Sequence, residues 1–303
     1  MKNYLLYFFA FLSVILLLPV LASVYPKSLT QAESPCVSIK YDDGSIKKEP
    51  LEDYVFKVLI GLIGSDTGQE TANAFAVSVR SCACYIIRNG HNHKDFDVCS
   101  DPKCCFRVTS PEQLKKEKPE NADIIIEKAK SACEKTKGCV LTYKNMPAMA
   151  LFHTGSGERT ADCARFPYLV SVRNTDESQY GLSKAEKKFS YKEFSELTGF
   201  DVKSAEDAEK CCVIYRKDGR AEFAVCSKKT LSADELIKRL SLPSDDFLLS
   251  FTDDGIDVSC FGKGRGFGMS FLGACALEKS GKSFDEILGF YYPLLSLNKI
   301  YNN

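Results

Sequence analysis

The sequence predicts a mixed α+β fold, in which an apolar N-terminal segment precedes a two-lobed ectodomain of amphipathic helices and antiparallel strands. Three observations carry this prediction: an uncharged stretch at the start, apolar residues at three- and four-residue spacing after position 50, and short strand-like runs between turn residues further on. A hydrophobic content of 45% over 303 residues is enough for a core and excludes a disordered chain. Forty basic and forty acidic residues cancel, so no net charge attracts nucleic acid, which is excluded as a partner.

Residues 4–24 contain no charge and follow Lys2. About 20 apolar residues can cross a bilayer, and this is longer than the usual core of a cleaved signal, so residues 1–25 are expected to be a retained single-pass membrane anchor. Pro19 and the signal-peptidase-like triplet at 20–22 keep a cleaved signal, and hence a secreted protein, as the alternative. Either way, the rest of the chain is expected outside the cytoplasm, where cysteines are more often disulfide-bonded than free.

Two amphipathic helices open the ectodomain. Apolar residues recur at helical spacing over 51–62, and a turn at 64–66 ends this helix. Thr67 and Glu70 have the spacing of a capping box, and a second apolar stripe follows over residues 72–89. We expect the two helices to pack against each other.

The remaining elements alternate between helices and short strands. The connection with the weakest pattern of secondary structure lies around 180–210, so we expect one lobe at 26–180 and a second at 181–303. In order, the pattern predicts a helix over 123–135, a β-hairpin of 139–143 with 149–153, a charged stretch over 183–211, strands at 212–215 and 221–226, a helix over 232–240, strands over 247–259, and a final helix opened by the capping box Ser283 to Glu286.

Four soft or borderline metal ligands lie within thirteen residues, namely His93, Cys99, Cys104 and Cys105. Imidazole and thiolate groups in this composition suit tetrahedral Zn²⁺. In an exported protein a disulfide between two of these cysteines explains the same spacing equally well, so spacing alone leaves both readings open. Cys104 and Cys105 are not expected to bond each other, because a vicinal disulfide is strained.

Glycines alternate between Gly262 and Gly268, just before Met269-Ser270. This run is not a phosphate-binding loop, because the Gly-Lys-Ser/Thr ending is missing. Alternating glycines indicate tight bends or the close approach of another backbone or ligand, and a kinked strand is the alternative. Separately, His153 and Ser156 stand three residues apart in a hydroxyl-rich turn without an orienting acid nearby, so a binding turn is favoured over a catalytic triad.

Taken together, these segments resemble the stage II sporulation protein D family, which also includes the enhancer of the vegetative wall amidase, over about residues 51–301. No single piece is decisive, but the set in this order is highly specific. The pieces are Leu51-Glu-Asp-Tyr-Val55, Glu70 with Ala76-Val-Ser-Val-Arg80, Asp97-Val-Cys99-Ser-Asp-Pro, Gly138-Cys-Val-Leu-Thr-Tyr143, Phe152-His153 with Ser156-Gly157 and Thr160, Pro167-Tyr-Leu-Val-Ser-Val172, residues 231–247, Gly264-Arg-Gly-Phe-Gly-Met-Ser270 with Gly273-Ala274, and Glu286-Ile-Leu with Tyr291-Tyr-Pro293.

The resemblance implies a membrane-anchored lytic transglycosylase that cuts peptidoglycan glycan strands stripped of stem peptides, beside a partner amidase or endopeptidase, during forespore engulfment. Some members of the family bind zinc through a His and Cys cluster after the second helix. His93, Cys99 and Cys105 fall at that place, and Cys104 takes a position often held by His, so the resemblance favours a structural zinc over a disulfide. The residues expected to contact the glycan are His153, Ser156, Tyr168, Arg265 and Ser270.

The carboxyl group that would act as general acid is absent from its usual position in the sequence. A transglycosylase needs a protonated carboxyl at the glycosidic oxygen, because the sugar's own hydroxyl attacks the anomeric carbon. In the family this group is a Glu at the end of the first helix, and counting without gaps from Leu51 and from Arg80 places it at Leu62. Leucine cannot transfer a proton, so no catalytic residue is assigned. Asp66 is the first candidate for a substitute acid.

Two further polar positions of the family are replaced, because Arg265 and Phe271 stand where His and Gln are usual. We therefore expect a retained glycan groove with altered or lost chemistry, in a protein that binds glycan strands or a wall hydrolase with weak or no cleavage. An active transglycosylase with a different acid is the alternative. A purely structural exported partner is a third reading.

Overall fold

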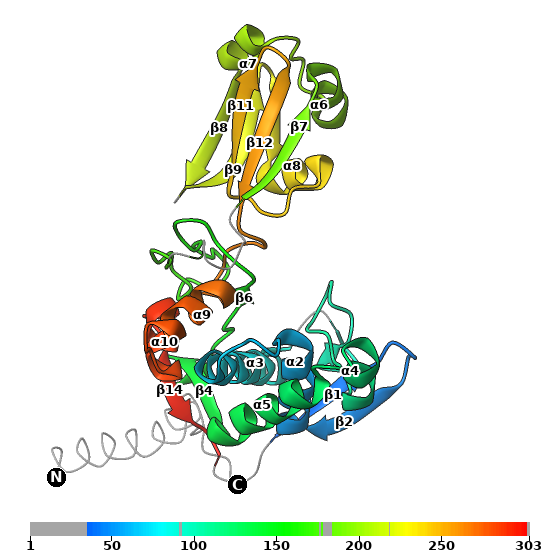
Figure 1. Ribbon diagram of the computed structural model, residues 1–303, viewed down its shortest axis with the longest axis vertical. Helices are drawn as coiled ribbons and strands as arrows, with labels where there is room; N and C mark the ends of the chain where they lie inside the picture. Colours follow the sequence, from blue (N-terminus) through cyan, green and yellow to red (C-terminus); the bar gives the residue numbers. More distant parts are fainter. Residues whose placement is uncertain (1–34, 91–92, 176, 178–183, 218, 302–303) are drawn as a thin grey trace, which may run out of the picture.

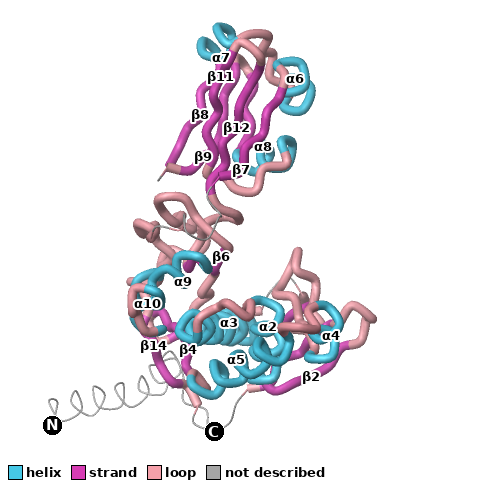
Figure 2. Tube along the Cα trace, in the orientation of Figure 1, coloured by secondary structure: helices cyan, strands magenta, loops and turns pink. Residues whose placement is uncertain are grey.

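A computed structural model describes residues 35–90, 93–175, 177, 184–217 and 219–301. The fold is mixed α+β, with helices and several small sheets, as the sequence predicts. Figure 1 shows two bodies along the long axis, a lower one around α3 and an upper one around β12. Helices dominate the lower body and strands the upper one (Figure 2).

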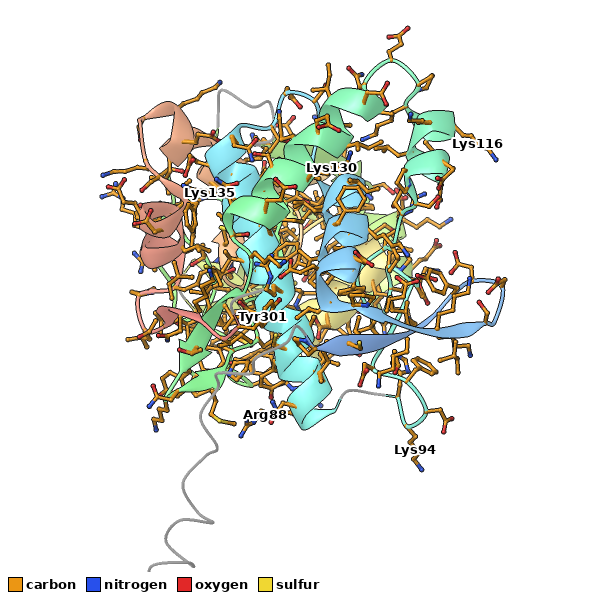
Figure 3. The ribbon with its side chains drawn as sticks, turned by 90° about the horizontal axis from the view of Figure 1, so that it is seen from below. Arg88, Lys94, Lys116, Lys130, Lys135 and Tyr301 are labelled. Atoms are coloured by element: carbon orange, nitrogen blue, oxygen red, sulfur yellow. The ribbon has the colours of Figure 1, made fainter. Side chains whose placement is uncertain are left out.

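The first body is built around one long buried helix, α3, whose Ala-rich sequence lets neighbours approach closely. Glu52 and Arg80 tie α2 to α3 through two hydrogen bonds of 2.9 and 2.7 Å, and the Arg80 side chain is fully buried. In Figure 3, Lys130 and Lys135 lie along the outer helix α5, while Tyr301 lies nearer the centre. The helices of this body are α2 (Leu51–Leu62), α3 (Gln69–Asn89), α4 (Pro111–Glu117), α5 (Ala122–Lys135), α9 (Phe271–Lys279) and α10 (Phe284–Tyr291). Its strands are β1 (Cys36–Lys40), β2 (Ile46–Pro50), β3 (Val98–Cys99), β4 (Cys139–Tyr143), β5 (Met146–Pro147), β6 (Phe152–His153), β13 (Met269–Ser270) and β14 (Ser296–Lys299).

The start of α3 is capped differently from the expectation. Thr67 and Glu70 do not form a capping box; the Thr67 hydroxyl accepts a hydrogen bond from the Gly64 amide instead. The carboxylate of Glu278 on α9 accepts from the amides of Glu70 and Thr71, at 3.0 Å each. Glu70 in turn accepts from the amide that opens α10. The capping box at the start of α10 is confirmed.

The expected hairpin of 139–143 with 149–153 is wrong in its second strand. β4 pairs on one side with the two-residue β5 and on the other with β14. The chain then leaves this sheet, and β6 pairs in parallel with β13, more than a hundred residues later. A turn pattern identifies a reversal of the chain, but it does not identify the partner of the strand that follows.

The second body contains two three-stranded antiparallel sheets, ordered β10-β9-β8 and β11-β12-β7. Within the charged stretch at 183–211, residues 184–211 form a strand and two helices. Three Ser N-caps, at the starts of α6, α7 and α8, accept hydrogen bonds from amides three residues on. The elements are β7 (Lys184–Phe189), α6 (Tyr191–Thr198), α7 (Ala205–Cys211), β8 (Cys212–Lys217), β9 (Arg220–Cys226), β10 (Lys229–Ser232), α8 (Ala233–Leu240), β11 (Phe247–Thr252) and β12 (Gly255–Phe261).

Buried apolar contacts divide the chain differently from the expected lobes at 26–180 and 181–303. One hydrophobic cluster takes residues from 189 to 260 only. The other joins residues 37–169 to residues 269–301, because β14 pairs with β4 and α10 packs on α3. The second body is therefore an insertion within the first.

The expected membrane anchor at 1–25 lies outside the described residues. In the part of the chain that the structure describes, no helix is both long and apolar enough to span a bilayer.

Candidate functional site

The structure brings all four expected metal ligands together. One ligand atom from each of His93, Cys99, Cys104 and Cys105 lies within 4.8 Å of the others. The His93 Nε2 atom is 3.3 Å from the Cys104 sulfur and 3.8 Å from the Cys105 sulfur, and the two sulfurs are 3.8 Å apart. Local structure fixes this arrangement: Cys99 ends β3, and the Asp101 carbonyl accepts hydrogen bonds from the amides of both Cys104 and Cys105.

The donor set and its spacing fit zinc. Metal–sulfur bonds of about 2.3 Å in a tetrahedron place the sulfurs about 3.8 Å apart, which is the separation of Cys104 and Cys105. Burial raises the pKa of the Cys105 thiol to about 12, so a nearby cation would be needed to hold it as a thiolate near neutral pH. The cluster also borders an apolar cavity of about 560 Å³, which is lined in part by Cys104, Cys105 and Phe106.

Three of the expected glycan-contacting residues meet in a second cluster, but they are buried there. His153 is 8% exposed, Ser156 4% and Ser270 0%. The Nδ1 atom of His153 lies 3.2 Å from the Phe267 carbonyl oxygen, and its Nε2 atom contacts the Ser156 hydroxyl. Burial lowers the pKa of His153 to about 4, so the ring is neutral and donates from Nδ1 to Phe267.

Glu177 joins these groups, although no pattern in the sequence marks it as a site residue. Its carboxylate accepts hydrogen bonds from the Ser156 amide at 3.0 Å, from the Asn174 side-chain amide at 2.5 Å, and from the Ser270 hydroxyl. Burial raises the pKa of this carboxyl. The cluster therefore ties the turn after β6 to the start of α9, and its polar groups use each other as partners.

The glycine-rich run lies close against this turn, as the alternating glycines predict. A Cβ atom at Gly268, where φ is +68°, would lie 1.9 Å from the Leu151 carbonyl oxygen, and a Cβ at Gly266 would collide with the guanidinium of Arg220. Only glycine permits these approaches. Arg220 comes from β9 in the second body, where it is 4% exposed and forms an ion pair with Asp245.

Tyr168 and Arg265 lie apart from the buried cluster. Tyr168 is 7% exposed, and its hydroxyl accepts a hydrogen bond from the Met149 amide within the first core. Arg265 is exposed, where it pairs with Asp234 and lies over the Phe267 ring. It lines a cavity of about 310 Å³ whose wall includes Ala161 from the first body and Arg220 from the second. Arg220 lines the same cavity, and its buried Nε atom has no hydrogen-bond partner among the described residues.

Leu62, at the end of α2, is half-buried against the first core. Asp66 follows in an exposed turn and lines a cavity of about 240 Å³ together with Phe271 and Glu278. The Phe271 ring lies 5.1 Å from that of the buried Phe75, which continues the apolar character of this region.

Comparison with known proteins gives one consistent result. The family model described as Stage II sporulation protein matches residues 42–143. The chain is 29% identical over 259 residues to Stage II sporulation protein D of Bacillus subtilis (strain 168), covering 82% of this chain and 74% of the relative. It is 28% identical over 284 residues to Stage II sporulation protein D of Bacillus amyloliquefaciens, covering 89% and 81%. An uncharacterized protein of Brachyspira hyodysenteriae (strain ATCC 49526 / WA1) is 28% identical over 261 residues, covering 84% and 68%.

Proposed function

Because this chain belongs to the stage II sporulation protein D family and is thus a sporulation-related protein, we propose that it binds peptidoglycan glycan strands and cuts them weakly or not at all. The observation that carries the proposal is the side chain of Leu62, which occupies the family's acid position and packs against the core. General-acid catalysis of glycosidic cleavage needs a carboxyl that is protonated when it meets the leaving oxygen. Leu62 can supply only apolar contact.

Of the carboxyls in the described part of the chain, neither Asp66 nor Glu177 is well placed to replace it. Asp66 lies in the same region, but it is exposed, unlike the apolar pockets in which general-acid carboxyls lie. Glu177 is buried and its pKa is raised, but its oxygens already accept three hydrogen bonds and it is only 5% exposed. A substrate oxygen would have to displace these donors. An active transglycosylase that uses Asp66 or Glu177 is the alternative proposal.

The cavity lined by residues of both bodies is the place where we propose that a strand binds. Arg265 is exposed there, and Arg220 lines the same cavity. Guanidinium groups bind carboxylates and sugar hydroxyls well, and a strand stripped of stem peptides carries a lactyl carboxylate on each muramic unit. His153, Ser156 and Ser270 then act indirectly, by fixing the backbone of the turn and of the glycine-rich run.

We further propose that Zn²⁺ is held by His93, Cys99, Cys104 and Cys105. Four protein ligands leave no open coordination position, so the ion would brace the loop after α3 and would not activate water. The same reading includes a membrane-anchored protein acting outside the cytoplasm, with a wall amidase or endopeptidase as its protein partner. A structural exported partner without glycan binding is the third proposal.

The decisive experiment compares the full-length chain with Leu62→Glu and Leu62→Gln on purified, peptide-stripped glycan strands. Mass spectrometry would look for fragments ending in 1,6-anhydromuramic acid, and a pull-down would measure binding. We expect all three proteins to bind and only Leu62→Glu to release anhydro-ended fragments. Leu62→Gln is the matched control, because it has similar size and polarity but no transferable proton.

Cleavage by the unchanged chain would overturn the proposal and support the alternative. Asp66→Asn and Glu177→Gln would then identify the acid by abolishing that cleavage. Failure of the unchanged chain to bind strands would instead support the structural reading.

A further inference from the structure

Three cysteine thiols meet in the second body, far along the molecule from the His93 cluster. The sulfurs of Cys211, Cys212 and Cys226 all lie within 4.8 Å of one another, and those of Cys211 and Cys226 are 3.4 Å apart. Cys211 is the last residue of α7 and Cys212 the first of β8, while Cys226 ends β9. The cluster therefore lies at the end of the body where α7 is drawn (Figure 1).

Backbone pairing fixes this meeting. Cys212 stands opposite Cys226 in the antiparallel register of β8 and β9. The carbonyl of Cys211 accepts a hydrogen bond of 3.2 Å from the amide of Ser227, the residue after Cys226. Ser227 has φ of +53° at the turn into β10, which is unusual for a residue with a side chain. Both sides of the cluster are thus held by main-chain contacts that do not depend on the sulfurs.

A disulfide accounts for this arrangement poorly. One bond can join only two of the three sulfurs, and it would leave a third thiol against the sulfur pair. Direct bonding of the neighbours Cys211 and Cys212 would make a strained vicinal disulfide. Among the described residues the cluster contains three convergent thiols and no histidine or carboxylate ligand. Thiolates are the donors that thiophilic metal ions prefer.

We propose that Cys211, Cys212 and Cys226 bind a Zn²⁺ ion, at a second site independent of the His93 cluster. Zinc–sulfur bonds of about 2.3 Å place sulfurs about 3.8 to 4.0 Å apart, which lies within the span of this cluster. Binding would release the thiol protons and leave three thiolates on the ion. Cys226 is buried, whereas Cys211 and Cys212 are half-exposed, so the ion would face solvent on one side and complete its coordination with water.

The test measures bound zinc in the full-length chain after reduction, removal of metal by a chelator, reloading with Zn²⁺ and exhaustive dialysis. We expect Cys226→Ser and Cys212→Ser each to lose one equivalent of zinc per chain relative to the unchanged protein, whatever the His93 cluster holds. Cys260→Ser is the matched control and should lose none, because Cys260 lies in β12 of the same body and its thiol donates to the Ser244 carbonyl.

Loading with Co²⁺ gives a second readout, since thiolate-to-cobalt charge-transfer absorption reports the number of sulfur ligands. In a Cys104→Ser, Cys105→Ser background, that absorption should remain and should disappear when Cys212→Ser is added. Circular dichroism checks that each variant is folded, and the half-exposed Cys212 is the safer site if Cys226→Ser unfolds. Unchanged zinc in folded Cys212→Ser would overturn the proposal. So would mass-spectrometric mapping of a disulfide from Cys226 to Cys211 or Cys212 in the metal-loaded chain.

Discussion

His153 is a neutral imidazole enclosed by protein, and this makes the stability of the fold depend on pH. Its pKa falls from 6.5 to about 4 on folding because burial disfavours the charged ring. Between these two values the unfolded chain binds a proton that the folded chain does not. The free energy of unfolding should therefore fall as pH drops from 6.5 to about 4, by on the order of 3 kcal/mol from this residue.

Urea denaturation at several pH values measures the effect as a difference between the unchanged chain and His153→Asn. The variant loses stability at every pH, because the contacts with Ser156 and Phe267 change. Between pH 6.5 and about 4, the free energy of unfolding of the variant should nevertheless depend less steeply on pH than that of the unchanged chain. Parallel curves for the two proteins would show that His153 does not titrate as its burial implies.

Sequence separation decided which site residues could be predicted. The four expected metal ligands lie within thirteen residues, and His153 and Ser156 are three apart, so local spacing was enough to group them. Glu177 contacts Ser270 across 93 positions, and nothing near it in the sequence marks it. The burial of His153 and Ser270 could not be predicted from the sequence either, because a polar residue in a turn pattern is expected to face solvent.

Among the elements, the capping of α3 by Glu278 from α9 can be tested by a single substitution. Glu278 accepts hydrogen bonds from two amides at the start of α3. Its negative charge also interacts favourably with the positive end of the helix dipole there. We expect Glu278→Ala to lower the free energy of unfolding by about 1 to 2 kcal/mol. Glu206→Ala on α7 is the control, because the exposed pair of Glu206 with Lys210 should contribute only a few tenths of a kcal/mol. Equal losses in thermal or urea denaturation would contradict the capping role.

Helices were predicted better than strand partners. The helices at 51–62 and 123–135 follow from apolar spacing, which is a property of the segment itself. The partner of β6 is β13, and the partner of β4 is β14, neither of which is adjacent in sequence. Pairings of this kind depend on how the whole chain folds, so no local pattern could show them.

Arg220 contacts both bodies of the protein. It pairs with Asp245 inside the second body, lies 3.5 Å from the Ser156 hydroxyl, and packs under Gly266. Arg220→Met leaves the buried Asp245 without its counter-charge, so we expect a loss of about 3 to 5 kcal/mol in the free energy of unfolding.

The double variant Arg220→Met, Asp245→Leu separates charge from packing. It should be clearly more stable than Arg220→Met alone, because no charge is then left buried. Denaturation followed by circular dichroism gives the free energy of unfolding of Arg220→Met, of Asp245→Leu and of the double variant. If the double variant loses as much as the sum of the two single variants, the ion pair does not stabilise this region.

The insertion of the second body within the first has a consequence for synthesis on the ribosome. Residues 184–261 can pair their own strands as soon as they emerge, since every partner in those two sheets lies within this span. The first core cannot be completed so early, because β4 pairs with β14 and Glu52 accepts a hydrogen bond from the Tyr301 hydroxyl. Both partners follow the inserted body in the sequence. The body that begins first is thus finished last, and a nascent chain from which residues 294–301 have not yet emerged would present β4 as an open edge.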